Sequence, residues 1–282
     1  MRVFDAKLKL QSQLRLMRSE NNTIGMVPTM GALHEGHLAL VRQALSENDV
    51  VVVSIFINPT QFNNPEDLNK YPRSMEQDSK LLSELSEELL IFAPGIREMY
   101  PESVESVSYN FDGIEEVMEG KHRPGHFDGV ATIVEALLRA VSPDRAYFGE
   151  KDYQQLQIVR KLVSQKQLPI EIMGCPIVRE PSGLAMSSRN ERLPKRLRKE
   201  ASFIYKTLQA AKVKFGTESA IEVSDWVDNE FNIHPDLELE YFEIADAETL
   251  RPIRRKQKEN KYRAFIAVYA EGIRLIDNIA LN

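Results

Sequence analysis

Two close pairs account for four of the five histidines, His34 with His37 and His122 with His126. His34 and His37 are three residues apart where a predicted strand passes into a predicted helix, so both side chains should lie over the N-terminus of that helix. Exposed amides and the helix dipole attract anions there, and imidazole donors would strengthen phosphate binding. A metal-binding pair and ordinary helix capping are the alternatives. The metal is disfavoured, because neither a Cys nor a third ligand at a telling spacing accompanies the pair, and the zincin spacing is absent.

Other patterns that carry chemistry are missing from the sequence. Neither the Walker A pattern nor the glycine fingerprint of dinucleotide-binding proteins occurs, so a nucleotide would have to be held in another way. A search for a Ser-His-Asp or Cys-His nucleophile finds no persuasive candidate. The single cysteine, Cys175, stands at the end of a predicted strand, and we interpret it as a small apolar filler.

The elements that must position these residues follow from the alternation of short apolar runs with amphipathic helical patterns in the first two-thirds of the chain. This alternation indicates βαβ units and a parallel sheet covered on both faces. The predicted strands are Thr23–Val27, Val50–Ile57, Leu89–Ala93 and Arg145–Phe148. The predicted helices begin near Gly36, after Ser74 in a capping box with Gln77, before Val130, and after Asp152 as the capping residue. We therefore predict an α/β fold with a Rossmann-like, doubly wound parallel sheet.

The pattern changes near residue 180, where Pro176, Pro181 and Pro194 surround a segment with Gly and Ser. Beyond it, helical segments at 195–215 and 220–231 precede two β-rich runs at 237–244 and 262–276, with no crossover helix between the runs. That order predicts a small α+β domain with antiparallel strands. We place a nucleotide- and substrate-binding domain at 1–179 and a smaller C-terminal α+β domain at 180–282.

The composition excludes several classes of partner. The chain has 282 residues, of which 43% are hydrophobic and 28% charged, enough for one sizeable core and a smaller second one. A formal net charge of -6 argues against an extended nucleic-acid groove, since phosphate neutralisation requires a basic excess. One basic run, Arg251 to Arg263, is interpreted as a solvated turn before a strand, with a binding patch as the alternative.

The same composition predicts where the protein works. A single cysteine cannot form an internal disulfide, and residues 1–10 lack the apolar core of a signal peptide, so we expect a cytoplasmic protein. The longest apolar stretch, Val50 to Ile57, is far shorter than the roughly 18 residues needed to span a membrane. We therefore expect neither nucleic acid nor a membrane among its partners.

Several blocks of this sequence resemble a known family. The HEGH stretch from His34 to His37 resembles the HxGH motif of the adenylate-forming nucleotidyltransferase superfamily, and AMSSR at 185–189 resembles its mobile KMSKS-like loop. Longer stretches at 26–37, 54–62, 123–127 and 147–152 resemble pantothenate synthetases, also called pantoate–β-alanine ligases, in order and at family spacing. The resemblance covers most of residues 23–190, and the C-terminal domain adds little to it. Ser187 and Ser188 replace the lysines of the synthetase-type loop.

The resemblance implies a reaction in which pantoate condenses with β-alanine while ATP becomes AMP and pyrophosphate, through an enzyme-bound pantoyl adenylate. The pantoate carboxylate attacks the α-phosphorus, so the substrate supplies the nucleophile. The protein must position the reactants and stabilise charge on the leaving pyrophosphate. The resemblance also implies ATP as a substrate, Mg2+ held largely by phosphate oxygens and water, and a homodimer formed through the N-terminal domain.

Site residues are carried over by the same resemblance. The implied catalytic residues are His34, His37, Lys151 and Arg189. The implied ATP contacts are Met30, Gly31, Ala32, Leu33, His34, Glu35, Gly36, His37, Gly149, Glu150, Lys151, Asp152, Val178, Met186, Ser187, Ser188 and Arg189. The implied contacts to pantoate and β-alanine are Gln61, Gln155 and Asn58, whose neutral amides suit a substrate with two hydroxyls and a carboxylate. Asp78 is the candidate protein contact to Mg2+.

Some interpretations stay open at this point. Arg123 and His126 fit either a wall of the acyl or β-alanine pocket or a structural role. Three other functions share parts of the pattern: a nucleotidylyltransferase that attacks with a phosphate, a class I aminoacyl-tRNA synthetase, and a catalytically silent nucleotide-binding regulator. The acidic balance and small second domain disfavour the synthetase, and the intact histidine pair with Lys151 and Arg189 disfavours the regulator.

Overall fold

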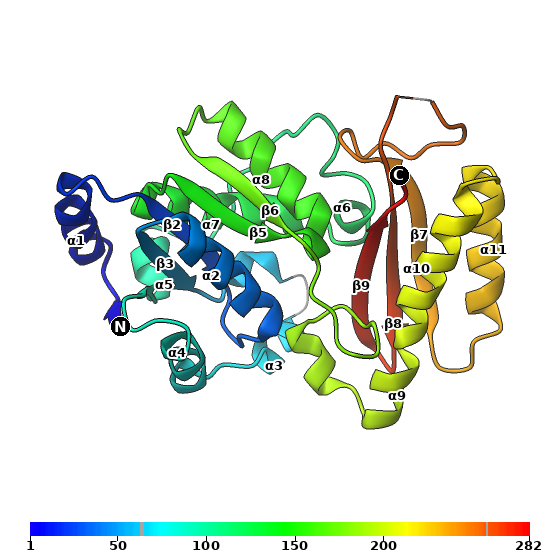
Figure 1. Cartoon of the computed structure of the whole chain (residues 1–282), viewed down its shortest axis with the longest axis horizontal. Helices are drawn as coiled ribbons and strands as arrows, with labels where there is room; N and C mark the ends of the chain where they lie inside the picture. The colour runs from blue at the N-terminus through cyan, green and yellow to red at the C-terminus, as the bar shows by residue number, and fades with distance from the viewer. Residues whose placement is uncertain (63–64, 258) are drawn as a thin grey trace.

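A six-stranded parallel sheet forms the N-terminal part of the computed structural model, which describes residues 1–62, 65–257 and 259–282 (Figure 1). Its strands lie in the order β1-β4-β3-β2-β5-β6. Their bounds are β1 Arg2–Phe4, β2 Ile24–Thr29, β3 Val50–Ile55, β4 Leu90–Phe92, β5 Arg145–Gly149 and β6 Glu171–Cys175. Because β2 pairs with β3 on one side and with β5 on the other, the chain reverses its winding between β2 and β5. Ligands of such sheets bind beyond the carboxyl ends of the strands at this switch point.

Helices cover both faces of this sheet, as the apolar patterns predict. Successive residues of the buried strand β3 enter opposite cores, Val50 and Val52 on one face and Val51 and Val53 on the other. The first face is covered by α1 Lys7–Ser19, α7 His126–Val141 and α8 Tyr153–Gln165, and the second by α2 Glu35–Glu47 and α4 Met75–Ser83. Shorter helices lie in the connections: η1 Pro59–Gln61, α3 Pro65–Lys70, α5 Ile96–Met99, α6 Glu119–His122 and η2 Glu150–Asp152. The predicted doubly wound α/β fold is confirmed.

A three-stranded antiparallel sheet, in the order β7-β8-β9, forms the C-terminal part. Its strands are β7 Glu238–Asp246, β8 Tyr262–Ala270 and β9 Ile273–Ala280, and its helices are η3 Ser188–Arg192, α9 Lys195–Glu200, α10 Ser202–Phe215 and α11 Ala220–Asn232. A separate apolar core runs from Leu184 to Leu281 between α10, α11 and the sheet. The α+β character is confirmed, while the boundary at 179/180 stays a prediction that falls between β6 and this second core.

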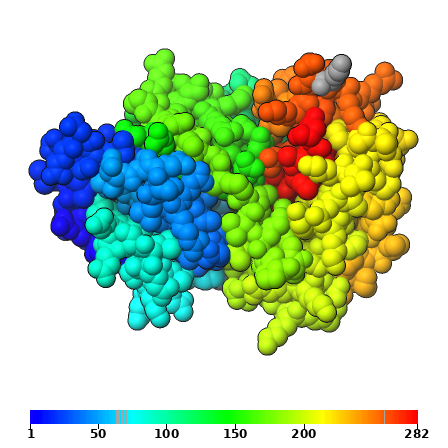
Figure 2. Space-filling view, viewed as in Figure 1, coloured from blue at the N-terminus to red at the C-terminus, as the bar shows by residue number. Residues whose placement is uncertain are grey.

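The segment that follows β6 lies between the two parts of the molecule, as the yellow-green atoms of the space-filling view show (Figure 2). Apolar residues of the C-terminal part also join the first core, namely Ala245, Leu250 and Phe265. None of the helices in the described ranges has the length and apolar character needed to cross a membrane.

Several local details differ from the sequence-based prediction. The strand β1 and the helix α1 were not predicted; β1 is a three-residue edge strand whose exposed Arg2 and Val3 give little apolar pattern. Asp152 is the N-cap residue of α8, as predicted, but its side chain makes no capping hydrogen bond. The predicted run at 262–276 is a hairpin, because Glu271 and Gly272 adopt φ of 46° and 75° and turn the chain.

The basic run from Arg251 to Arg263 mostly forms the predicted solvated connection between β7 and β8, with Lys258 outside the described residues. Arg263 is the exception. It is 8% exposed and pairs with Glu150 of the N-terminal part at 3.1 Å. Ser74 forms one half of the predicted capping box: its Oγ accepts the N–H of Gln77 at the start of α4, without the reciprocal bond from the Gln77 side chain.

Candidate active site

The turn after β2 places the first histidine pair at the N-terminus of α2. His34 is the N-cap residue, and its Nδ1 accepts the N–H of Gly36 at 3.1 Å. His37 Nδ1 accepts the N–H of His34 at 3.4 Å, and the two ring centroids are 4.1 Å apart. Since both Nδ1 atoms are acceptors, each neutral ring carries its proton on Nε2. The capping alternative is therefore confirmed, and it leaves both Nε2–H groups available as donors to an anion.

Both imidazoles are neutral near neutral pH. Burial lowers the pKa of His34 to about 4, and the positive charge of Lys151 contributes. Burial likewise lowers the pKa of His37 to about 3, with further contributions from His34 and Lys151. Neutral rings donate hydrogen bonds without adding a buried charge, and the helix N-terminus supplies the positive potential. The pair therefore suits the oxygen atoms of a phosphate.

Asp78 of α4 holds this turn from behind. Its side chain is 2% exposed, and its two oxygens accept the N–H groups of Ala32 at 3.0 Å and Leu33 at 2.7 Å. The turn needs such support, because Gly31 and the non-glycine Ala32 have φ of 78° and 51°. The Asp78 carboxylate therefore positions the turn through its backbone amides, and its predicted contact with Mg2+ stays a prediction.

The loop after β5 supplies the cation of the site. β5 lies beside β2, so the turn Glu150–Asp152 meets the histidine turn at the same edge of the sheet. The Lys151 side chain is 19% exposed, and its Nζ lies 3.7 Å from Asp152 Oδ2. Glu150 points elsewhere, toward Arg263 of β8. Lys151 and Asp152 therefore face the site, whereas Glu150 faces the C-terminal part.

A cavity of about 180 Å³, here called the histidine cavity, brings together predicted residues from distant parts of the sequence. Its predicted lining residues are Met30, His34, Gly36, His37, Gly149, Lys151, Asp152, Gln155, Val178, Met186, Ser187, Ser188 and Arg189. The backbone N–H of Met186 bonds to the carbonyl of Val178 at 3.0 Å, so the KMSKS-like loop is tied to the segment that follows β6.

Besides Glu150, which faces the C-terminal part, four predicted ATP contacts do not line this cavity in the described structure: Gly31, Ala32, Leu33 and Glu35. Gly31, Ala32 and Leu33 form the turn held by Asp78. Glu35 is exposed and pairs with Arg42 on α2. These residues shape the turn, and direct contact between their side chains and ATP stays a prediction.

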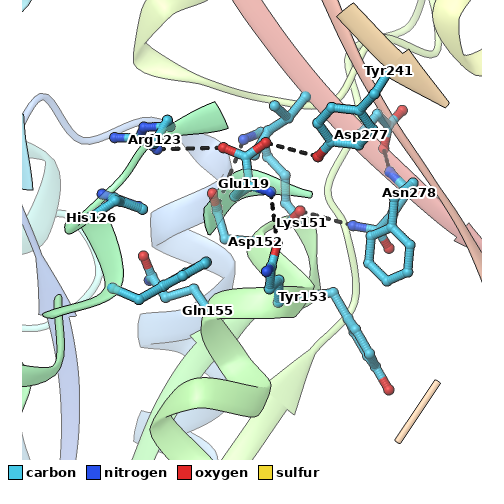
Figure 3. Close-up of a pocket in the computed structure, with 14 residues that line it drawn as sticks. Glu119, Arg123, His126, Lys151, Asp152, Tyr153, Gln155, Tyr241, Asp277 and Asn278 are labelled. Carbon is cyan, nitrogen blue, oxygen red and sulfur yellow. Dashed lines mark hydrogen bonds and ion pairs between the residues drawn. The ribbon is translucent and has the colours of Figure 1, made fainter. Parts of the chain in front are cut away.

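Two further cavities adjoin the histidine cavity at Lys151 and Asp152, which line all three. An inner pocket of about 30 Å³ is lined by Arg123, His126, Gln155, Tyr241 and Asn278 among others (Figure 3). An arginine cleft of about 370 Å³ is lined by His122, Arg123, Arg189, Arg192 and Arg274 among others. The site therefore extends from the sheet edge to β8 and β9 of the C-terminal part.

The three predicted amides occupy different positions. Gln155 lines both the histidine cavity and the inner pocket. Gln61 lines none of the three cavities as the described residues define them, but its carbonyl accepts from Arg123 at 3.2 Å and from His126 Nδ1 at 3.0 Å. Asn58 is 0% exposed, and its amide bonds to Gly129 and Tyr100. Asn58 thus lies behind the three cavities, and its direct contact with pantoate stays a prediction.

Sequence reasoning missed a buried charged cluster, here called the charged wall, in which Tyr241 and Arg274 of the C-terminal part meet Glu119 and Arg123. Glu119 of α6 accepts two hydrogen bonds from Arg274 of β9, both at 2.7 Å, and a third from Tyr241 Oη at 2.8 Å. Arg123 lies 3.5 Å from the same carboxylate. Burial opposes ionisation of Glu119, but Arg274 outweighs it and the pKa of Glu119 falls to about 2. No sequence pattern could reveal this wall, because Tyr241 and Arg274 occupy ordinary strand positions far from the N-terminal motifs.

The fold and the site together define a class of protein. It is an α/β protein with a histidine turn at the switch point of its sheet, where imidazole, ammonium and guanidinium groups converge on one cavity. A model of the family described as Pantoate-beta-alanine ligase matches residues 2–280. The chain belongs to this family.

Relatives support the same assignment over the full length. The chain is 56% identical to the pantothenate synthetase of Christiangramia forsetii, with 100% of both chains covered, and 53% identical to that of Flavobacterium psychrophilum, with 99% of both covered. A crystal structure of pantothenate synthetase from Thermus thermophilus superimposes with a TM-score of 0.91 at 41% identity, covering 100% of this chain and 99% of that one. A Francisella tularensis pantoate-beta-alanine ligase, complexed with Beta-gamma ATP and Beta-alanine, gives a TM-score of 0.79 at 35% identity, with 100% and 98% covered.

Asp78→Asn tests the positioning role of that carboxylate. An amide keeps the size but turns an NH2 group toward one of the two backbone N–H donors, so the protein should lose about 1–3 kcal/mol of unfolding free energy and bind ATP more weakly. Urea unfolding and calorimetry measure both effects. Glu76→Gln, on the exposed side of the same helix, is the matched control. If stability were unchanged and the Mg2+ requirement altered, Asp78 would be a contact to Mg2+ rather than a support of the turn.

His126 provides a pH test. Burial lowers its pKa from 6.5 to about 3, so below pH 6.5 the unfolded chain binds a proton that the folded chain does not. The contribution of neutral His126 to the free energy of unfolding is therefore complete above pH 6.5 and is lost as the pH falls toward 3. His126→Gln should make the loss of unfolding free energy between pH 7 and pH 5 smaller by up to about 2 kcal/mol. Urea unfolding at both pH values measures this; equal losses in the two proteins would contradict the burial of a neutral ring.

Proposed function

We propose that this ligase joins pantoate to β-alanine in two steps at one site, with pantoyl adenylate held between them. In the first step a pantoate carboxylate oxygen bonds to the α-phosphorus of ATP, and the bond to the β-phosphate oxygen breaks to release pyrophosphate. In the second step the β-alanine nitrogen bonds to the acyl carbon, AMP leaves and the amine loses a proton. The observation that carries the proposal is that Lys151 lines both the histidine cavity and the inner pocket, where the two substrates would meet.

The histidine turn is proposed to hold the ATP phosphates. The Nε2–H groups of His34 and His37 are donors on rings that line the histidine cavity, and the N-terminus of α2 lies beneath them. Their role is electrostatic rather than acid–base, because both rings have a low pKa and use Nδ1 as a backbone acceptor. The purine would lie against Val178, and Asp152 would reach the ribose.

Lys151 and Arg189 are proposed to neutralise the charge that develops on the phosphates. Lys151 lies between the cavities and would face the reacting α-phosphate. Arg189 lines both the histidine cavity and the arginine cleft, so its guanidinium would meet the β- and γ-phosphates as they leave. Cys175 supplies no competing nucleophile, since it is 3% exposed and burial raises its pKa to about 11. Catalysis then consists of positioning and electrostatic stabilisation.

Pantoate is proposed to bind beside Gln155, where the inner pocket meets the larger histidine cavity. The amide of Gln155 would donate to and accept from the carboxylate and hydroxyls of pantoate. Gln61 would complete this contact, and Arg123 and His126 would hold the backbone of Gln61 through its carbonyl. Asn58 would support the same region from behind, through Gly129 and Tyr100.

Magnesium is proposed to enter with ATP. Within residues 1–62, 65–257 and 259–282, no three His, Cys, Asp or Glu side chains gather into a metal-binding group. This supports an ion bound through phosphate oxygens and water, as Mg2+ usually is when it accompanies a nucleotide. When bound, it would withdraw charge from the triphosphate, while His34, His37 and Arg189 orient the oxygens.

A homodimer and a cytoplasmic location complete the proposal. The resemblance to the family supports the dimer, and the single unpaired Cys175 supports a reducing compartment. Sedimentation velocity on the purified chain tests the oligomeric state directly.

Pyrophosphate exchange tests the two-step reaction. Pantoate with ATP and Mg2+ should support incorporation of labelled pyrophosphate into ATP without any β-alanine, because adenylate formation does not need the amine. Exchange that appears only when β-alanine is added would exclude an adenylate formed before amine binding. Release of ADP and phosphate would exclude the whole scheme.

Arg189→Ala separates the two half-reactions. Loss of one preorganised contact to the leaving group should slow adenylate formation by on the order of 10² to 10³. Attack of β-alanine on supplied pantoyl adenylate expels AMP rather than pyrophosphate and should change little. Rapid-quench measurement of each step decides. Arg196→Ala, whose guanidinium pairs with Asp236 at the surface, is the matched control. Equal slowing of both steps would mean that Arg189 holds the loop rather than the leaving group.

A further inference from the structure

Asn278 of β9, in the C-terminal part of the chain, contacts the turn Glu150–Asp152 that carries Lys151. It is 1% exposed. A side-chain amide that is so deeply buried needs hydrogen-bond partners for both its NH2 group and its oxygen. Its Nδ2 donates to the carbonyl of Lys151 at 2.8 Å (Figure 3). The same Nδ2 donates to the carbonyl of Glu150 at 2.9 Å. One amide group therefore fixes two consecutive peptide units of the short turn that carries Lys151.

The orientation of this amide is set by Arg263. Nη1 of Arg263 donates to Asn278 Oδ1, and Nη2 of Arg263 donates to the Glu150 carboxylate at 3.1 Å. It also lies over the ring of Tyr153, 3.9 Å from the centroid. A flipped amide would place its oxygen against two carbonyl oxygens and its NH2 against a guanidinium. The donors of Asn278 are thus directed at the turn.

The neighbouring residue anchors the strand itself. Asp277 is 4% exposed and accepts two hydrogen bonds from Arg179, at 2.5 and 2.9 Å, as well as the N–H of Asn278 at 2.8 Å. Arg179 belongs to the segment that leads into the loop with Met186 and Arg189, where it bridges to Ala185. The Asp277–Asn278 pair therefore holds two parts of the site at once, with Asn278 assigned to the Lys151 turn.

We propose that Asn278 is a positioning residue for the ligase reaction, which acts by fixing the backbone of Glu150 and Lys151 so that the Lys151 ammonium faces the reacting phosphate. The inference rests on the proposed role of Lys151. The turn Glu150–Asp152 has three residues, and Lys151 is partly buried at its centre, so a shift of the backbone displaces the ammonium directly. A displacement of about 1 Å is enough to cost on the order of 10² in rate.

A double-mutant cycle in single-turnover adenylate formation tests this. Asn278→Ala should slow the step by about 10- to 100-fold in the wild-type background. In the Lys151→Ala background the same change should have less than about a threefold effect, because a residue that acts through Lys151 has nothing left to position. Rates are normalised to the folded fraction. Asn282→Ala, an exposed asparagine after the same strand, is the matched control and should leave the rate unchanged.

Asn278→Ser keeps one hydroxyl donor, and it replaces Asn278→Ala in the cycle if the alanine variant does not fold. It should give a smaller loss with the same dependence on Lys151. An equal loss with and without Lys151, or no loss for a folded Asn278 variant, would overturn the positioning role. If Lys151→Ala alone forms adenylate at the wild-type rate, the proposed role of Lys151 fails instead, and the cycle distinguishes that outcome.

Discussion

A buried ion pair between the two parts of the chain is the interaction on which the site depends most. The Glu119 side chain is 9% exposed, and its carboxylate would be costly to bury alone, but Arg274 donates two hydrogen bonds of 2.7 Å to it. Gln154 also accepts the backbone N–H of Glu119, so the carboxylate cannot shift freely. Because the pair stabilises only in the correct geometry, it fixes where β9 lies over the sheet edge. Asn278 on the same strand then meets the Lys151 turn.

The chemistry that we propose depends on histidines that are kept neutral as hydrogen-bond donors and on cations that would neutralise the phosphates. Backbone N–H groups occupy Nδ1 of His34 and of His37, which leaves Nε2–H donors over the N-terminus of α2. Lys151 and Arg189 supply the positive charge to the histidine cavity from two different loops. In the proposed adenylate-forming step the substrate brings its own carboxylate nucleophile, so the protein needs no reactive residue. This explains why an ordinary search for a nucleophile fails on a sequence that nevertheless encodes an enzyme.

Three residues show where sequence reasoning reached its limit at the site. Asp78 and Asn58 are polar residues close to the motifs, and the sequence suggested contact with ligands. In the structure Asp78 accepts two N–H groups of the turn with positive φ, and Asn58 donates to the carbonyl of Gly129 in α7. Asp152 stands where a helix cap is common, but its carboxylate faces Lys151 and the cavity. Residue type and spacing do not say which of two nearby acceptors a side chain will reach.

The sequence by itself determined the alternation of strands and helices, the parallel sheet and the histidine turn. These depend on the apolar period and on residues that are neighbours in the chain, such as His34 and Gly36. The tertiary structure decided which distant residues complete the site. Arg274, Tyr241 and Asn278 lie on strands whose pattern reports only burial, and their partners Glu119, Glu150 and Lys151 are more than a hundred residues away. Such contacts are set by the packing of one part of the chain on the other. They cannot be predicted from the sequence, because no local periodicity shows which strand position faces a given loop.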